Sequence, residues 1–140
     1  MSNQGRGDPE TAAEIEALLA FAPMIEARTA GRWEGGDRRP DGTITLPWFD
    51  YDPAVLEFVQ ACGENGWIEQ FDWPAWQPEA FKYYEKPERL AGADVDTIRK
   101  LITLHIRKDR FSEGHLAAMV EEGHIAAIFA RLAEIRRSIA

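Results

Sequence analysis

Residues 94–139 read DVDTIRKLITLHIRKDRFSEGHLAAMVEEGHIAAIFARLAEIRRSI, and this stretch decides the fold. Apolar residues recur in it every three or four positions, which is the repeat of an amphipathic helix. Asp94 is suited to cap a first helix, which is predicted to end near Asp109. Ser112 is the predicted cap of a second helix, and Gly123 is predicted to separate it from a third. The C-terminal third of the chain is therefore predicted to be three consecutive helices.

Three further helices are predicted upstream from capping and proline signals. Asp8-Pro9-Glu10 begins the first, which Pro23 either kinks or restarts and which is expected to continue to Gly31. Asp52-Pro53 repeats the same start for the second. Residues 73–84 form the third, because prolines are tolerated in its first turns and another proline stops it.

A small antiparallel sheet is predicted between these helices. Pro40-Asp41-Gly42 is a turn signature, and it places a hairpin over residues 31–49. The arm before the turn is placed around residues 32–34, and Thr43–Leu46 alternates as a strand does. Residues 67–71 are a candidate third strand.

These elements together predict an α+β fold, mainly α. We expect a single compact helical domain over residues 9–140, with a two- or three-stranded antiparallel sheet. Residues 1–8 are expected to form a disordered N-terminal tail, because they are small and polar.

The composition of the chain predicts where the protein is located and which partners are disfavoured. No apolar run reaches the roughly 20 residues of a membrane helix, and the N-terminus has no signal-peptide pattern. Cys62 is the only cysteine, so no internal disulfide can form, and a cytoplasmic location is expected. The net charge of −8 disfavours nucleic acid and anionic membranes as partners.

Potential chemistry is concentrated between residues 105 and 115. His105 and Asp109 are four residues apart and share a helix face, so His105 is a candidate general base oriented by Asp109. Arg110 is a candidate for holding an anion, and Glu113 and His115 complete the candidate catalytic set. The same residues fit a purely structural role, in which Asp109 pairs with Arg110 or caps the next helix. Both interpretations stay open.

Other sites are less well supported by the sequence. No metal site and no cofactor are predicted, because HExxH, paired CxxC, EF-hand and phosphate-loop patterns are all absent. A helix-turn-helix outline over residues 112–139 lacks side chains that read bases. Trp73 and Trp76 are candidate ligand-binding residues, since tryptophan is common at interface hot spots, or they belong to an aromatic core.

Several strings in the sequence carry a family resemblance. They are FDWPAW at 71–76, TIRKLITLH at 97–105, DRFSEGHL at 109–116 and GHI at 123–125. They resemble an uncharacterised bacterial family, domain of unknown function 6508. The resemblance implies a bacterial cytoplasmic protein and no particular activity. It adds weight to a set of residues in or beside its most specific string: His105, Arg107, Asp109, Arg110 and Glu113. Arg107 is added to the candidate ligand-binding residues on this basis.

Two functions from different classes follow from the sequence. The first is a non-enzymatic protein-interaction module whose partner is another protein. The alternative is a small enzyme or anionic-ligand-binding protein that uses the segment from His105 to His115. Whether the protein is an enzyme stays open at this stage.

Overall fold

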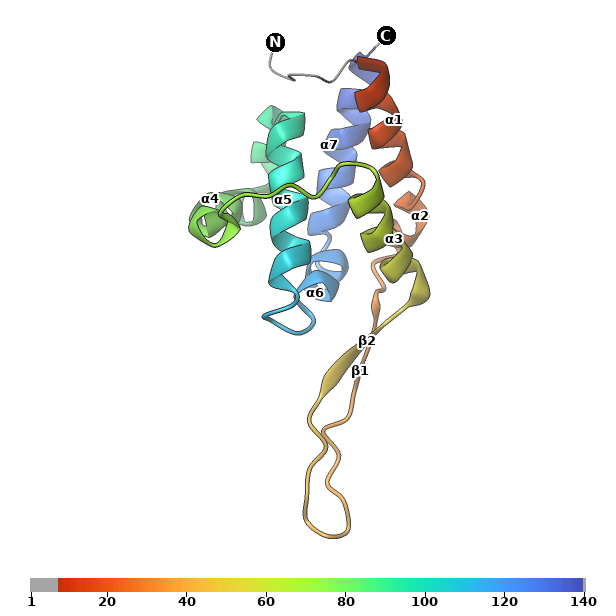
Figure 1. The fold of residues 1–140 in the computed structure, drawn as a ribbon, viewed down its shortest axis with the longest axis vertical. Coiled ribbons are helices and arrows are strands. Elements are labelled where there is room, and N and C mark those ends of the chain that lie inside the picture. The colour runs from red at the N-terminus through yellow and green to blue at the C-terminus, as the bar shows by residue number, and fades with distance from the viewer. Residues whose placement is uncertain (1–7, 140) are drawn as a thin grey trace.

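A computed structural model of the chain describes residues 8–139. The fold is α+β and mainly α, as predicted: helices dominate, with one small antiparallel sheet (Figure 1). The elements in chain order are α1 (Asp8–Leu19), α2 (Ala22–Ala27), β1 (Gly31–Glu34), β2 (Trp48–Tyr51), α3 (Pro53–Glu64), α4 (Trp73–Glu85), the 3-10 helix η1 (Pro87–Gly92), α5 (Val95–Lys108), α6 (His115–Glu121) and α7 (His124–Ser138). The predicted tail lies outside the described residues except for Asp8, which belongs to α1.

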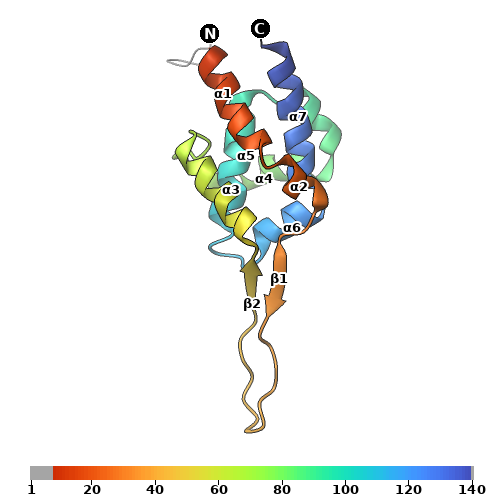
Figure 2. The same cartoon turned by 90° about the vertical axis from the view of Figure 1, so that its right-hand side faces the viewer.

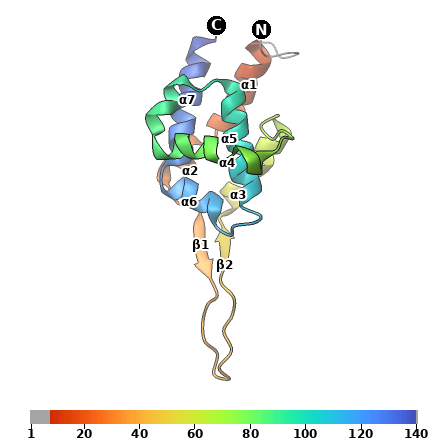
Figure 3. The same ribbon diagram turned by 90° about the vertical axis from the view of Figure 1, so that its left-hand side faces the viewer.

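Helix α7 is the centre of the helical body. It packs against α1, α2, α5, α6 and η1, and α4 packs across α5 (Figure 3). The apolar stripe predicted for α7 is buried at Ile125, Ile128 and Leu132, and Leu101 of α5 is fully buried as well. One apolar cluster includes residues from Ile15 to Leu132. The helical periodicity of the C-terminal third therefore predicted the core-facing side chains correctly.

Of the two alternatives predicted at Pro23, the structure has the restart and not the kink. Helix α1 ends at Leu19, and α2 begins at Ala22 with Pro23 in its first turn, where a missing N–H costs nothing. Helix α2 then ends at Ala27, well before Gly31, because Arg28 has a left-handed backbone with φ of +59°.

The sheet is a two-stranded ribbon that leads into a long hairpin away from the helices (Figure 2). Trp33 pairs with Phe49 and Gly31 with Tyr51, so the predicted arm before the turn is confirmed. The strand predicted over Thr43–Leu46 is wrong, because only Ile44 forms a bridge there and the strand proper begins at Trp48. Pro47 has no N–H to donate to a ladder, which favours the interruption at this point.

The third strand predicted over residues 67–71 is also wrong. This segment lies across α5 and bonds to its side chains instead of to a strand. Thr103 Oγ1 donates to the carbonyl of Trp67 at 3.1 Å and accepts from the backbone N–H of Glu69 at 3.0 Å. The Trp67 side chain is completely buried. These residues are apolar because they are buried against a helix. A short apolar run in the sequence does not show whether the segment is a strand or an irregular segment that packs on a helix.

Within residues 8–139, no helix combines the length and the apolar character that crossing a bilayer requires.

Candidate functional site

The turn between α5 and α6 carries most of the predicted site. Asp94 caps α5 as expected, accepting from Thr97 N at 2.8 Å. The predicted capping role of Ser112 is wrong, because α6 begins at His115 and is preceded by Gly114. Asp109 supplies the side-chain acceptor instead: its Oδ1 accepts from Leu116 N at 2.9 Å.

Asp109 also fastens the hairpin to the helical body. Tyr51 donates its hydroxyl proton to Asp109 Oδ1 at 2.6 Å, and that hydroxyl accepts from Ala117 N at 3.1 Å. Burial, and then the bond to Asp109, raise the pKa of Tyr51 above its ordinary value. Within residues 8–139, no hydrogen bond joins Asp109 to His105: Asp109 Oδ1 accepts from Tyr51 and Leu116, and His105 Nδ1 faces His115.

Two further contacts fix the base of the hairpin. Glu113 Oε2 accepts from the backbone N–H of Phe49 at 2.9 Å. Gly114 has φ of +81°, and a Cβ there would lie 2.7 Å from the ring of Trp33. Any larger residue would displace Trp33 from the position where it meets Phe49 edge to face. The string from Asp109 to Gly114 thus holds β1 and β2 against the start of α6.

We expect Asp109→Ala to lower the free energy of unfolding by about 2–3 kcal/mol, because it removes a helix cap and a charge-assisted bond from Tyr51 together. Asp109→Asn, which keeps an acceptor oxygen, is expected to cost clearly less. Urea denaturation measures both. A loss below about 0.5 kcal/mol for Asp109→Ala would show that the hairpin base does not depend on this carboxylate.

A histidine cluster lies on the other side of the same turn. His105 Nδ1 of α5 lies 3.0 Å from His115 Nε2 of α6, so one imidazole donates its N–H to the other. The ring of His124 meets that of His105 edge to face with centroids 5.0 Å apart. His105 Nε2 and both ring nitrogens of His124 are buried and have no partner among the described residues.

The three imidazoles are held in the neutral form at pH 7. Burial lowers the pKa of His105 well below its ordinary value, and the neighbouring His124, His115 and Lys108 lower it further. Burial, and then His115, lower the pKa of His124 to about 4. The pKa of His115 is also lowered, chiefly by burial. Neutral imidazoles at this position can donate and accept hydrogen bonds, and they carry no charge to attract an anion.

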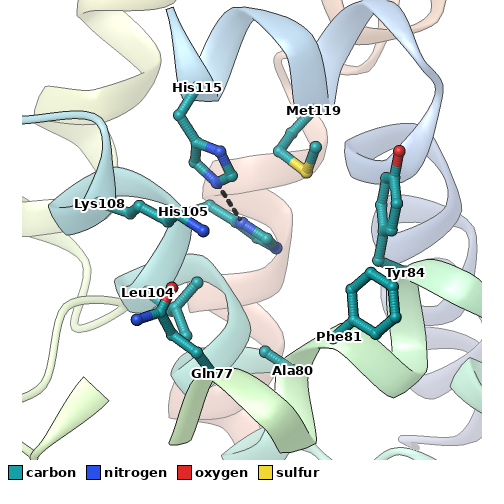
Figure 4. Close-up of a pocket in the computed structure, with 9 residues that line it drawn as sticks. All are labelled: Gln77, Ala80, Phe81, Tyr84, Leu104, His105, Lys108, His115 and Met119. Carbon is teal, nitrogen blue, oxygen red and sulfur yellow. Dashed lines mark hydrogen bonds between the residues drawn. The ribbon is translucent and has the colours of Figure 1, made fainter. Parts of the chain in front are cut away.

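A pocket of about 220 Å³ opens beside the histidine pair. Figure 4 shows His105 and His115 on one side, with Phe81 and Tyr84 of α4 on the opposite side. The lining residues are Gln77, Ala80, Phe81, Tyr84, Leu104, His105, Lys108, His115 and Met119. Lys108 is the one permanently charged residue in this lining, and its side chain extends toward the imidazoles (Figure 4).

Residues 10–138 match a family described as a family of unknown function, DUF6508. The chain belongs to this family. Comparison with curated proteins and with solved structures gave no significant match. The match covers α2 to α7 completely and all of α1 except its first two residues, so the hairpin and the histidine cluster both lie inside the family region.

The residues of the string DRFSEGHL at 109–116 have two different structural roles. Asp109 and Glu113 hold the hairpin, and His115 joins His105 at the pocket. Arg110 is exposed and does not line the pocket, so the predicted grouping of Arg110 with His105 is wrong. Arg107 is half-buried and does not line it either.

The two candidate tryptophans are half-buried and lie at a separate place. Trp73 packs near the ring of Phe111 and Trp76 near that of Phe71, with centroid distances of 6.0 Å and 5.9 Å. Both also pack against the apolar core. Their placement agrees with the core interpretation better than with an open contact surface.

Sequence reasoning missed most of the pocket. Gln77, Ala80, Phe81 and Tyr84 recur every three or four residues along one face of α4, and Leu104 and Lys108 do the same on α5. That spacing is visible in the sequence, but only the packing of α4 across α5 makes the two faces meet.

Metal and DNA chemistry receive no support from this arrangement. Among residues 8–139, no group of three or more histidine, cysteine, aspartate or glutamate side chains is placed to hold a metal ion.

In the helix-turn-helix outline formed by α6 and α7, the first residues of the second helix, His124 and Ile125, are buried. A recognition helix needs that turn exposed to reach base edges.

Proposed function

We propose that this member of the family is a cytoplasmic, non-catalytic protein-interaction module that makes contact through its β1–β2 hairpin, and that the partner is a second copy of the chain. The observation that carries this proposal is the exposure of large apolar side chains along an element that extends away from the helices (Figure 1). Leu46 is 82% exposed, and Ile44, Trp33 and Trp48 are each about half exposed.

The backbone of the hairpin supports the same proposal. The sheet has two strands, so each has one edge without a strand beside it, although the Phe49 N–H of β2 already donates to Glu113. An isolated two-stranded ribbon is marginal in water, whereas pairing with a further ribbon adds both backbone bonds and apolar contact.

Charge favours a second copy as the occupant. Residues 31–51, which include both strands and the turn, contain three basic residues (Arg32, Arg38, Arg39) and four acidic ones (Glu34, Asp37, Asp41, Asp50), so they carry a net charge of −1 within a chain of net charge −8. Two copies therefore repel mainly through their helical bodies and only weakly through their hairpins. A two-fold arrangement lets a basic position of one hairpin face an acidic position of the other.

The proposed cytoplasmic location and the proposed single domain are supported by separate observations. Cys62 is a free, buried thiol whose pKa burial raises to about 12, so it stays protonated and packs as a small apolar group. A free thiol agrees with a reducing compartment. The apolar cluster from Ile15 to Leu132 supports one domain over residues 9–140.

Sedimentation equilibrium tests the proposal. We expect the chain to show twice its 15.8 kDa mass at micromolar concentration. Leu46→Lys is expected to weaken the dimer at least about 10-fold, because a two-fold contact contains the substitution twice.

Leu56→Lys is the matched control, since Leu56 is an exposed leucine on α3, outside the hairpin. It should leave the association constant unchanged. A chain that stays monomeric up to about 200 µM, or a dimer that Leu46→Lys leaves intact, would contradict the proposal.

A further inference from the structure

The pocket beside the histidine pair has the features of a small-ligand site. Its lining residues belong to α4, α5 and α6, so the site does not depend on the hairpin. Its volume of about 220 Å³ exceeds the roughly 150 Å³ of an engineered apolar cavity that binds benzene. One ring with a short polar group therefore fits the available space.

The walls of the pocket favour a flat apolar body. Phe81 and Tyr84 lie along one side, with their ring centroids 5.9 Å apart, and Leu104 and Met119 supply aliphatic and thioether surface (Figure 4). Ala80 leaves room between α4 and α5 because its side chain is a single methyl group. Aromatic rings and methionine sulfur both pack well against a planar ligand.

The polar side of the pocket favours a carboxylate. Lys108 forms no ion pair within 4.0 Å among the residues of the described part of the chain, although it lines the pocket. His115 is only partly buried and can offer a ring nitrogen to a ligand. His105 is 4% exposed, yet its Nε2 has no partner among the described residues. A buried imidazole nitrogen without a partner is costly, so a water, an ion or a polar ligand atom beside it would lower that cost.

We propose that this pocket binds a small carboxylic acid with a flat apolar body, the chemical class that benzoate represents, with Lys108 and His115 contacting the carboxylate. The body lies between Phe81, Leu104 and Met119. The proposal concerns binding and includes no covalent step. A second pocket, beside Tyr84 and His124, has two acidic side chains in its wall, Glu85 and Glu122, and does not suit an anion.

Titration of the ¹⁵N-labelled full-length protein with sodium benzoate at pH 7.5 tests this proposal. We expect saturable amide shifts around α4, α5 and α6, with a dissociation constant on the order of 1 mM or tighter. Acetate, which lacks the apolar body, and benzyl alcohol, which lacks the charge, should each bind at least about 10-fold more weakly.

Two variants and one control make the test specific. Lys108→Met should weaken benzoate at least about 10-fold. Phe81→Ala should weaken benzoate as well, and it removes an exposed side chain whose loss the fold tolerates. Lys100→Met is the control, because Lys100 lies on the same helix but beside Phe71 and Trp76, away from the pocket lining. No saturable shift with benzoate, or equal affinity in wild type and Lys108→Met, would overturn the proposal.

Discussion

Replacing Arg99 by methionine is expected to lower the free energy of unfolding by about 3–4 kcal/mol. Arg99 is only 2% exposed and joins three parts of the fold from α5. Its Nη1 donates to the carbonyl of Gly66 at 2.5 Å, and its Nη2 donates to Glu14 Oε1 of α1 at 2.6 Å. The guanidinium also lies over the ring of Trp67, 4.4 Å from its centroid.

The large effect follows from burial of the groups that Arg99 satisfies. Methionine fills a similar space but donates nothing, so it leaves the Gly66 carbonyl without this donor and removes the cation from the Trp67 ring. Arg99→Lys keeps the charge without the planar fork and is expected to recover only part of the loss.

Thermal and urea denaturation measure this effect, with a fall in Tm of roughly 10 °C expected for Arg99→Met. Arg137→Met, at an exposed position of α7, is the control and should change stability by less than about 0.5 kcal/mol. If Arg99→Met behaves like the control, the contacts of Arg99 do not hold the fold together.

Acid is expected to destabilise the protein through its histidine cluster. The unfolded chain takes up a proton at each histidine near pH 6.5, whereas the folded chain keeps His124 neutral until about pH 4. A histidine whose pKa is lower in the folded chain does not reduce the free energy of unfolding above about pH 6.5. Below pH 6.5 the unfolded chain binds the proton first, so the free energy of unfolding falls as the pH falls. His124 alone is expected to contribute a loss of about 2 kcal/mol between pH 7 and pH 5.

Burial sets the sign of this effect, and the neighbours of His124 change its size. His105 and His115 have lowered pKa values as well, so their protonation also favours the unfolded chain in this range. Glu122 acts in the opposite direction on His124 and His115, and Lys108 adds positive charge beside His105 and His115. Reduced repulsion within an acidic chain opposes the loss, so wild type alone is not a sufficient measurement.

Urea denaturation of wild type and His124→Phe at pH 7, 6 and 5 isolates the contribution of His124. The variant should lose about 2 kcal/mol less than wild type between pH 7 and pH 5, because it removes one titrating group and retains a buried ring. Parallel pH profiles for the two proteins would show that His124 is protonated as easily in the folded chain as in the unfolded one.

The sequence by itself predicted the α-helices, although not η1, and most of the side chains that they bury. The three- and four-residue repeat places Leu101, Ile128 and Leu132 on apolar stripes, and a helix with such a stripe must cover it whatever its neighbours are. The cap signal at Asp94 and the proline signal at Pro53 predicted the starts of α5 and α3 correctly. Both signals are local, because they depend only on backbone groups within one helical turn.

Tertiary structure alone decided which polar groups meet. Asp109 and His105 share a helix face, but the carboxylate of Asp109 turns to Tyr51, which is 58 residues away in sequence. The role of residues 67–71 likewise depends on Thr103, whose hydroxyl bonds to the backbone of Trp67 and Glu69 in place of a neighbouring strand. A local sequence pattern determines whether one helix or strand forms. The partner of a buried polar group depends instead on which distant donor or acceptor the fold brings within about 3 Å of it.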